Sequence, residues 1–161
     1  ELLRIAAAAA LPGAALPGGT GVHAGGAAAG YSEDLELTAF ARALRNAQVT
    51  SLGHGMQLIS FGPGPFFPDD VDLHRSDLVA REFYSKLFER ISMMRSSLLT
   101  GIPGTGKSWW VWYAVHRLLN QDPSPAIVWQ TFKHANTCVL FKGGRAFVGA
   151  LSAFTSELAD A

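Results

Sequence analysis

Residues 96–119 of the chain read SSLLTGIPGTGKSWWVWYAVHRLL, and this stretch decides the predicted fold. Its centre, from Gly101 to Ser108, matches the pattern G-x-x-x-x-G-K-[ST] without a mismatch. The apolar residues before the glycines predict a short buried strand at 96–100, and those after them predict a helix from Lys107 to about Leu119. A glycine loop between a strand and a helix is a setting in which backbone N–H groups surround phosphate oxygens. The sequence therefore predicts a phosphate-binding loop.

The residues of this loop have separate predicted roles. Lys107 would place its ammonium group between the β- and γ-phosphates of a nucleoside triphosphate, and it is the predicted catalytic residue. Ser108 would offer its hydroxyl to Mg²⁺, the expected cofactor together with ATP or another nucleoside triphosphate. The predicted phosphate-binding residues are Gly101, Pro103, Gly104, Thr105, Gly106, Lys107 and Ser108. Two alternatives are a chance match in a chain with 17 glycines and a loop that has lost its catalytic partners.

The helix after the loop is apolar on nearly every side. One stripe contains Val111, Ala114, Val115, Leu118 and Leu119, and a second contains Trp109, Trp112, Tyr113 and His116. Such a helix is buried on both sides or covered by a partner. We favour core packing of the aromatic face, with stacking on a nucleotide base and contact with a protein partner as alternatives. His116 is accordingly expected to be a packed or surface histidine rather than a catalytic base.

Regular elements are also expected on both sides of this region. Ser32 is the predicted cap of a helix that runs to about Asn46. A strand is expected at 56–61, before the sequence GPGP, and an apolar stripe from Ala80 to Ile91 predicts the best-defined helix. After the aromatic helix come strands at 126–132 and 137–141, and a Gly143-Gly144 hairpin leads to a third at 145–148.

These elements predict an α/β fold with a partly parallel, P-loop NTPase-like sheet. The sheet is expected to be incomplete and to carry an antiparallel meander after the first βα unit. Three regions are expected along the chain. Residues 1–30, with 11 Ala and 7 Gly, predict a flexible arm, and 31–75 a helix plus a Gly/Pro-rich connecting region. Residues 76–161 are predicted to be the N-terminal part of a P-loop NTPase domain.

Composition and charge exclude several classes of protein. The 161 residues suffice for one domain with a core, but not for a two-domain enzyme. Thirteen basic and thirteen acidic residues give no net charge, so neither nucleic-acid binding nor charge-driven membrane attraction is indicated. Cys138 is the single cysteine, which excludes an internal disulfide framework. A start at Glu1 suggests a fragment, a processed product or an incomplete gene model, and Ile5 to Leu11 faintly resembles a secretory signal.

Other candidate residues are weaker. The acidic cluster Asp69, Asp70 and Asp72 could contact Mg²⁺, but such clusters are mostly solvated loops. The pair His134 and Cys138 falls short of a metal site. A working NTPase also needs an acid at the end of a second core strand. The acids after Ser108 are Asp122, Glu157 and Asp160, and none of them ends a hydrophobic strand. The sequence thus contains half of an NTPase site.

The segment from Phe83 to Leu119 looks like the P-loop NTPase region of Crinkler-type effectors of oomycetes, and retrotransposon hot spot proteins of trypanosomes are similar. The resemblance lies in the loop 101–108, the aromatic helix after it and the β-rich stretch 126–149, and it spans roughly 76–158. It implies phosphate-binding roles for Gly101, Gly104, Gly106, Lys107 and Ser108. The family pattern would continue with a strand ending in Asp just beyond Ala161, and the nuclease-like domain of many members has no counterpart here.

The function expected from these observations is binding of a nucleoside triphosphate, with hydrolysis only in the complete parent protein. Whether the chain is itself an enzyme is left open, because the second acid is not visible. The alternatives are a non-hydrolysing interaction module and a truncated, degenerate copy of a Crinkler-type effector. An intracellular protein and a secreted effector that acts inside a host cell are both compatible with the sequence.

Overall fold

The computed structural model describes residues 5–7, 30–68, 75–94, 99–100, 102, 104–121, 125–130 and 136–155. A five-stranded sheet has the order β1-β6-β7-β8-β2, and a three-stranded sheet has the order β3-β4-β5. The strands are β1 Ile5–Ala7, β2 Tyr31–Glu33, β3 Gln48–Gly53, β4 Met56–Ser60, β5 Asp77–Ala80, β6 Ile127–Gln130, β7 Cys138–Lys142 and β8 Arg145–Gly149. The helices are α1 Leu35–Arg45, α2 Glu82–Ser92, α3 Lys107–Leu119 and a 3-10 helix at Leu151–Phe154.

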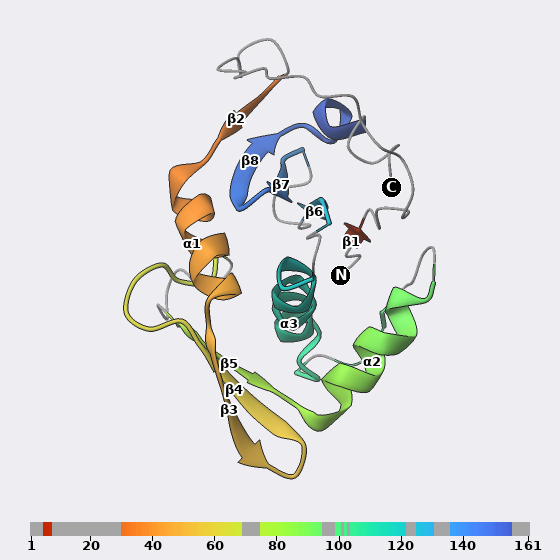
Figure 1. The fold of residues 1–161 in the computed structure, drawn as a ribbon. Helices are drawn as coiled ribbons and strands as arrows, with labels where there is room; N and C mark the ends of the chain where they lie inside the picture. Colours follow the sequence, from red (N-terminus) through yellow and green to blue (C-terminus); the bar gives the residue numbers. More distant parts are fainter. Residues whose placement is uncertain are drawn as a thin grey trace, which may run out of the picture.

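Helix α3 is the central element of the fold (Figure 1). It lies between the two sheets, with α1 on one side and α2 on the other. Nine of its 13 residues are buried, which explains why its sequence is apolar on nearly every side. The Trp112 ring packs against Phe40 of α1 and Trp129 of β6, with ring centroids 5.1 and 4.8 Å away. One apolar core therefore joins the helices to both sheets.

The predicted P-loop NTPase-like, partly parallel sheet is wrong. Every strand pair among the described residues is antiparallel. Of the strand expected at 96–100, Leu99 and Thr100 have no strand conformation, and 96–98 lie outside the described residues. The antiparallel meander itself is present, as β6, β7 and β8.

Two features explain why the sheet is antiparallel. A parallel arrangement would need the strand before the loop to lie beside β6, but β1 and β7 occupy both edges of β6. Tight turns impose antiparallel pairing elsewhere, since a two-residue connection can only join antiparallel strands. Gly143 and Gly144, with φ of +57° and +75°, make such a turn between β7 and β8. His54 and Gly55 make another between β3 and β4.

At the start of the chain, three residues of the expected flexible arm form a strand. Ile5–Ala7 form β1, which pairs with Ile127–Trp129 of β6. Composition did not indicate this strand, because pairing on a sheet edge uses backbone groups that every residue other than proline carries. Residues 1–4 and 8–29 lie outside the described residues.

Helix α1 confirms the predicted first helix but begins later. Its N-cap is Asp34, whose Oδ1 accepts a hydrogen bond of 2.9 Å from the Leu37 N–H, whereas Ser32 lies in β2. Helix α1 also packs along β8: the Asp34 N–H donates to the Ala146 carbonyl, and the Ala146 N–H donates to Thr38 Oγ1, both at 2.9 Å. These two hydrogen bonds fix α1 along β8, so that the C-terminal end of the helix lies near the β7–β8 turn.

The remaining elements largely follow the predictions. The strand expected at 56–61 is β4, the apolar stripe from Ala80 to Ile91 belongs mainly to α2, and the aromatic helix is α3. Strands β3 and β5 were not predicted, and they flank β4 in the smaller sheet. Within the part of the chain that the structure describes, no helix is long and apolar enough to cross a membrane.

Candidate phosphate-binding loop

The glycine loop leads directly into the N-terminus of α3. Gly106 is the N-cap, with φ of +89°, and Gly104 has φ of +81°. Residues with a Cβ rarely adopt such backbone angles, so both positions use the freedom of glycine. Gly101 and Pro103 lie outside the described residues. The loop thus leads into a helix N-terminus, where the helix dipole favours an anion.

Lys107 folds back over the loop. Its Nζ donates a hydrogen bond of 3.0 Å to the carbonyl of Ile102, five residues earlier. Thr105 Oγ1 donates to the same carbonyl at 3.0 Å. The ammonium group therefore lies beside the Ile102 carbonyl, at the start of the loop. Ser108 follows in the first turn of α3 with an exposed side chain.

Two side chains of the α2 region hold the loop in place. The Tyr84 hydroxyl donates a 2.8 Å hydrogen bond to the Gly106 carbonyl, and Arg81 Nη1 donates to the Thr105 carbonyl at 3.2 Å. Trp110 of α3 adds a further hydrogen bond to α2, since its Nε1 donates to the Tyr84 carbonyl at 3.3 Å. The sequence placed Tyr84 only in an apolar stripe, and no motif indicated that its hydroxyl or Arg81 would reach a loop more than 20 residues later.

The electrostatics of the loop favour a negatively charged ligand. Burial raises the pKa of Tyr84, with Arg81 opposing, so the group remains a neutral hydrogen-bond donor at neutral pH. Arg81 and Lys107 add two positive charges, each of which contacts a carbonyl of the loop. The neighbouring Glu82 carboxylate contacts Lys86 at 3.4 Å instead. The helix dipole and both cations therefore act in the same direction.

The other candidate residues are not brought to this loop by the described part of the structure. Cys138 is buried in β7, and burial raises the pKa of its thiol, which makes it a poor nucleophile and metal ligand. Asp69, Asp70, Asp72 and His134 lie outside the described residues, as do Asp122, Glu157 and Asp160. Among the residues that are described, no group of three His, Cys, Asp or Glu side chains could hold a metal ion.

The aromatic face of α3 is packed inside the protein. Trp112 and Tyr113 are each 2% exposed, and their neighbours come from other segments of the same chain. Trp109 is partly buried, with its ring against Phe67 and the Arg75 guanidinium 5.4 Å from its centre. Contacts within the chain thus account for the aromatic residues, as the core-packing interpretation expects. The protein partner on this face stays a prediction.

His116 belongs to the core and not to the loop. It is 7% exposed, and its Nδ1 lies 2.8 Å from the Leu44 carbonyl of α1. Because a carbonyl oxygen only accepts, Nδ1 carries the proton in this bond. Burial lowers the pKa of His116, the Leu44 carbonyl opposes this, and the nearby Arg117 lowers it further. The ring is therefore neutral at pH 7 and joins α3 to α1.

We expect the free energy of unfolding to decrease as the pH falls from about 7 to 5. The unfolded chain keeps an ordinary histidine pKa near 6.5, so below that pH it takes up a proton that the folded state accepts only at lower pH. The neutral ring contributes its full stabilisation above pH 6.5. As the pH falls from there toward the lower pKa of the folded state, the free energy of unfolding decreases by at most about 1.4 kcal/mol per pH unit. Urea denaturation of the wild type and of His116→Gln, which keeps an amide donor for Leu44, measures this. Equal pH dependence of the two proteins would contradict the prediction.

No family model, curated protein or solved structure matches this chain. The resemblance to Crinkler-type effectors and hot spot proteins therefore stays a prediction that rests on the loop, the aromatic helix and the β-rich stretch 126–149. The sheet that this resemblance implies is not the sheet of the described residues, in which all the strand pairs are antiparallel. The function has to be inferred from the geometry of the loop and its immediate neighbours.

Proposed function

We propose that the loop 101–108 binds the phosphates of a nucleoside triphosphate, with ATP as the first candidate. The observation that carries this proposal is the position of Lys107 Nζ, which is folded back onto the Ile102 carbonyl at the N-terminus of α3. In this position the ammonium group, the helix N-terminus and the glycine backbone converge on one small region. A chance match to the motif would not require this convergence.

The proposal does not depend on a parallel sheet. A phosphate site of this kind needs a helix N-terminus, glycines with positive φ and a cation. All three are local properties of 104–108 and α3. The larger sheet and α2 serve to hold α3 and the loop in place, which antiparallel strands do equally well.

The residues of the loop also fit a Mg²⁺ ion that arrives with the nucleotide. Mg²⁺ takes oxygen ligands, and most of these ligands come from phosphates and water. The Ser108 hydroxyl is an oxygen donor in the first turn of α3, next to the proposed phosphate position. When bound, the ion would neutralise part of the phosphate charge, and Ser108 would be its ligand from the described residues. The proposal covers binding, because every acid that follows Ser108 in the sequence lies outside the described residues.

Removal of the Lys107 charge tests the proposed function. A hydrogen bond to a charged group contributes about 1.5–3 kcal/mol, so Lys107→Ala should weaken Mg-ATP binding about ten- to hundredfold. Isothermal titration calorimetry at low salt measures this, with Mg-GTP as a second ligand to compare the bases. The matched control is Lys86→Ala, which removes an exposed lysine that pairs with Glu82 on α2.

The control should bind Mg-ATP like the wild type. Circular dichroism on each protein verifies that the variants are folded. The proposal fails if the folded wild type shows no binding at millimolar Mg-ATP, or if Lys107→Ala binds as tightly as Lys86→Ala.

A further inference from the structure

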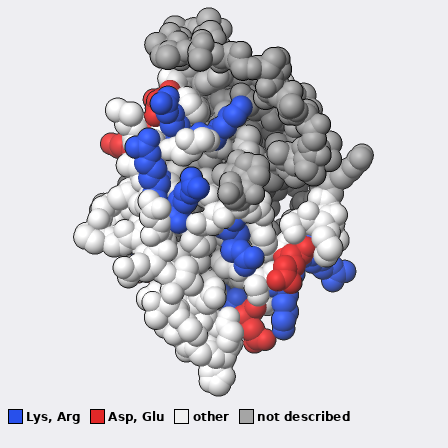
Figure 2. Space-filling view, viewed as in Figure 1, with Lys and Arg blue, Asp and Glu red and all other residues white. Residues whose placement is uncertain are grey.

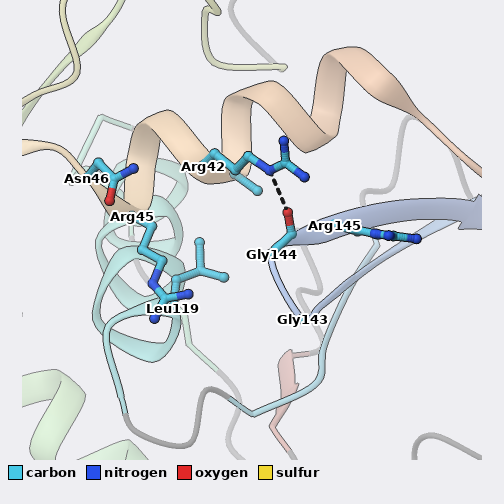
Figure 3. Close-up of a pocket in the computed structure, with 8 residues that line it drawn as sticks. Arg42, Arg45, Asn46, Leu119, Gly143, Gly144 and Arg145 are labelled. Carbon is cyan, nitrogen blue, oxygen red and sulfur yellow. Dashed lines mark hydrogen bonds between the residues drawn. The ribbon is translucent and has the colours of Figure 1, made fainter. Parts of the chain in front are cut away.

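A second basic site lies between the C-terminal end of α1 and the β7–β8 turn. The structure contains a pocket there of about 350 Å³ (Figure 3). Its lining consists of Ala41, Arg42, Arg45, Asn46, Leu119, Gly143, Gly144 and Arg145. None of these residues belongs to the glycine loop. Figure 2 shows basic side chains grouped over the region where α1 and β8 meet.

Packing of α1 on β8 determines the shape of this pocket. The helix follows β8 through the contacts of Asp34 and Thr38 with Ala146, so its last turn ends beside the turn at Gly143 and Gly144. Arg42 Nε donates a 3.1 Å hydrogen bond to the Gly144 carbonyl and thereby bridges the helix and the turn. Leu119, at the end of α3, contributes an apolar side chain to the lining (Figure 3).

The lining is positively charged. It contains three arginines and no carboxylate. Among the described residues, the Glu33 carboxylate lies 3.8 Å from Arg145 Nη1, and this ion pair is weak because both side chains are partly exposed to water. The C-terminal ends of α1 and α3 each bring about half a negative charge. Three full positive charges outweigh these partial charges, so the pocket attracts anions.

Helix stabilisation explains only part of this arrangement. Arg42 and Arg45 occupy the last turn of α1, where basic residues interact favourably with the helix dipole. That role needs neither a third arginine on β8 nor a hollow between the helix and the turn. Arg42 also uses one of its five N–H donors for Gly144, which orients the guanidinium group and leaves four donors for a ligand.

We propose that this pocket binds a small phosphorylated molecule, of the size of pyrophosphate or a sugar phosphate. Arginine guanidinium groups match the geometry of phosphate oxygens and bind them through paired hydrogen bonds. Arg42 and Arg45 are three residues apart and therefore share one side of α1, while Arg145 adds its charge to the lining from β8, with its side chain directed along the strand (Figure 3). The volume corresponds to the lower end of small-molecule pockets, which favours a free molecule over a protein surface.

The experiment must separate this pocket from the glycine loop, because pyrophosphate would bind at both. Calorimetric titration with pyrophosphate, without Mg²⁺, is therefore carried out on the full chain with Lys107→Ala as background. In that background Arg45→Gln and Arg145→Gln should each weaken pyrophosphate binding about five- to tenfold. Arg90→Gln, at an exposed position in the last turn of α2, is the matched control and should have no effect.

The outcomes are distinct for the two proposals. The proposal of a phosphate-binding pocket is overturned if three variants bind pyrophosphate with equal affinity, namely Arg45→Gln, Arg145→Gln and Arg90→Gln. If Arg45→Gln weakens pyrophosphate binding in the wild type and in the Lys107→Ala background, whereas Lys107→Ala changes neither pyrophosphate nor Mg-ATP binding, the pocket stands and the nucleotide loop fails. Tighter binding of a phosphoserine peptide than of pyrophosphate overturns the assignment to a small molecule. Circular dichroism on each variant excludes misfolding as the cause.

Discussion

Replacement of Trp112 with alanine is expected to lower the free energy of unfolding by about 3–5 kcal/mol, the range for large aromatic side chains in protein cores. Trp112 is 2% exposed and lies where α1, β6 and the segment after β4 meet. Its ring contacts Phe40, Phe67 and Trp129, with centroids between 4.8 and 5.9 Å away. Alanine would leave a cavity that three separate segments cannot all close, so a large part of the total stability would be lost.

Trp109→Ala is the matched control for this prediction. It removes the same side chain from the same helix, but Trp109 is only partly buried and packs mainly against Phe67 and Arg75. We expect this variant to lose about half as much stability or less, since less of the ring is withdrawn from water. Urea denaturation followed by circular dichroism measures both values. Equal losses in the two variants would show that Trp112 is not the centre of the core.

Gly106→Ala is expected to lower the free energy of unfolding by about 2–3 kcal/mol and to abolish nucleotide binding by the loop. At φ of +89° an alanine is strained by about 1–2 kcal/mol. Its Cβ would also lie 2.6 Å from the Tyr84 hydroxyl, a distance that forces the hydroxyl away from the Gly106 carbonyl. The lost hydrogen bond adds about 1 kcal/mol.

Gly104→Ala separates the cost of backbone strain from the cost of the collision with Tyr84. Gly104 has a similar φ of +81°, but a Cβ there would meet no atom within 4 Å. This variant should therefore lose only the 1–2 kcal/mol or so of backbone strain. A double variant, Gly106→Ala with Tyr84→Phe, removes the hydroxyl that causes the collision and should lose less stability than the two single changes together. Strictly additive losses would mean that Tyr84 does not press on the loop.

Local patterns in the sequence predicted several elements well. The periodicity of α2 and α3 and the two-glycine turn between β7 and β8 all appear in the structure. The helix from Lys107 to Leu119 has the predicted ends. These features depend on residues within a few positions of one another, and such interactions can be read directly from the sequence. The cap of α1 was misassigned by two residues because Ser32 and Asp34 are both good N-cap residues.

Strand pairing was the main error, and it has a physical cause. The expected parallel sheet came from the motif at 101–108, which describes a loop and the start of a helix but no strand partner. Strand β3 is exposed along its whole length, so it lacks the apolar alternation that would have indicated it. Its signal was the turn at His54 and Gly55, whose positive φ values join β3 to β4.

By itself, the sequence of this protein determined the glycine loop, the helix that follows it and the charge of Lys107, because these are properties of consecutive residues. Only the tertiary structure decided that β1 and β2 pair with β6 and β8, that Tyr84 and Arg81 hold the loop, and that Arg42, Arg45 and Arg145 line one pocket. Each of these contacts joins segments that are far apart in the chain. Their positions depend on how the shared core packs around α3, and that packing has no local signature.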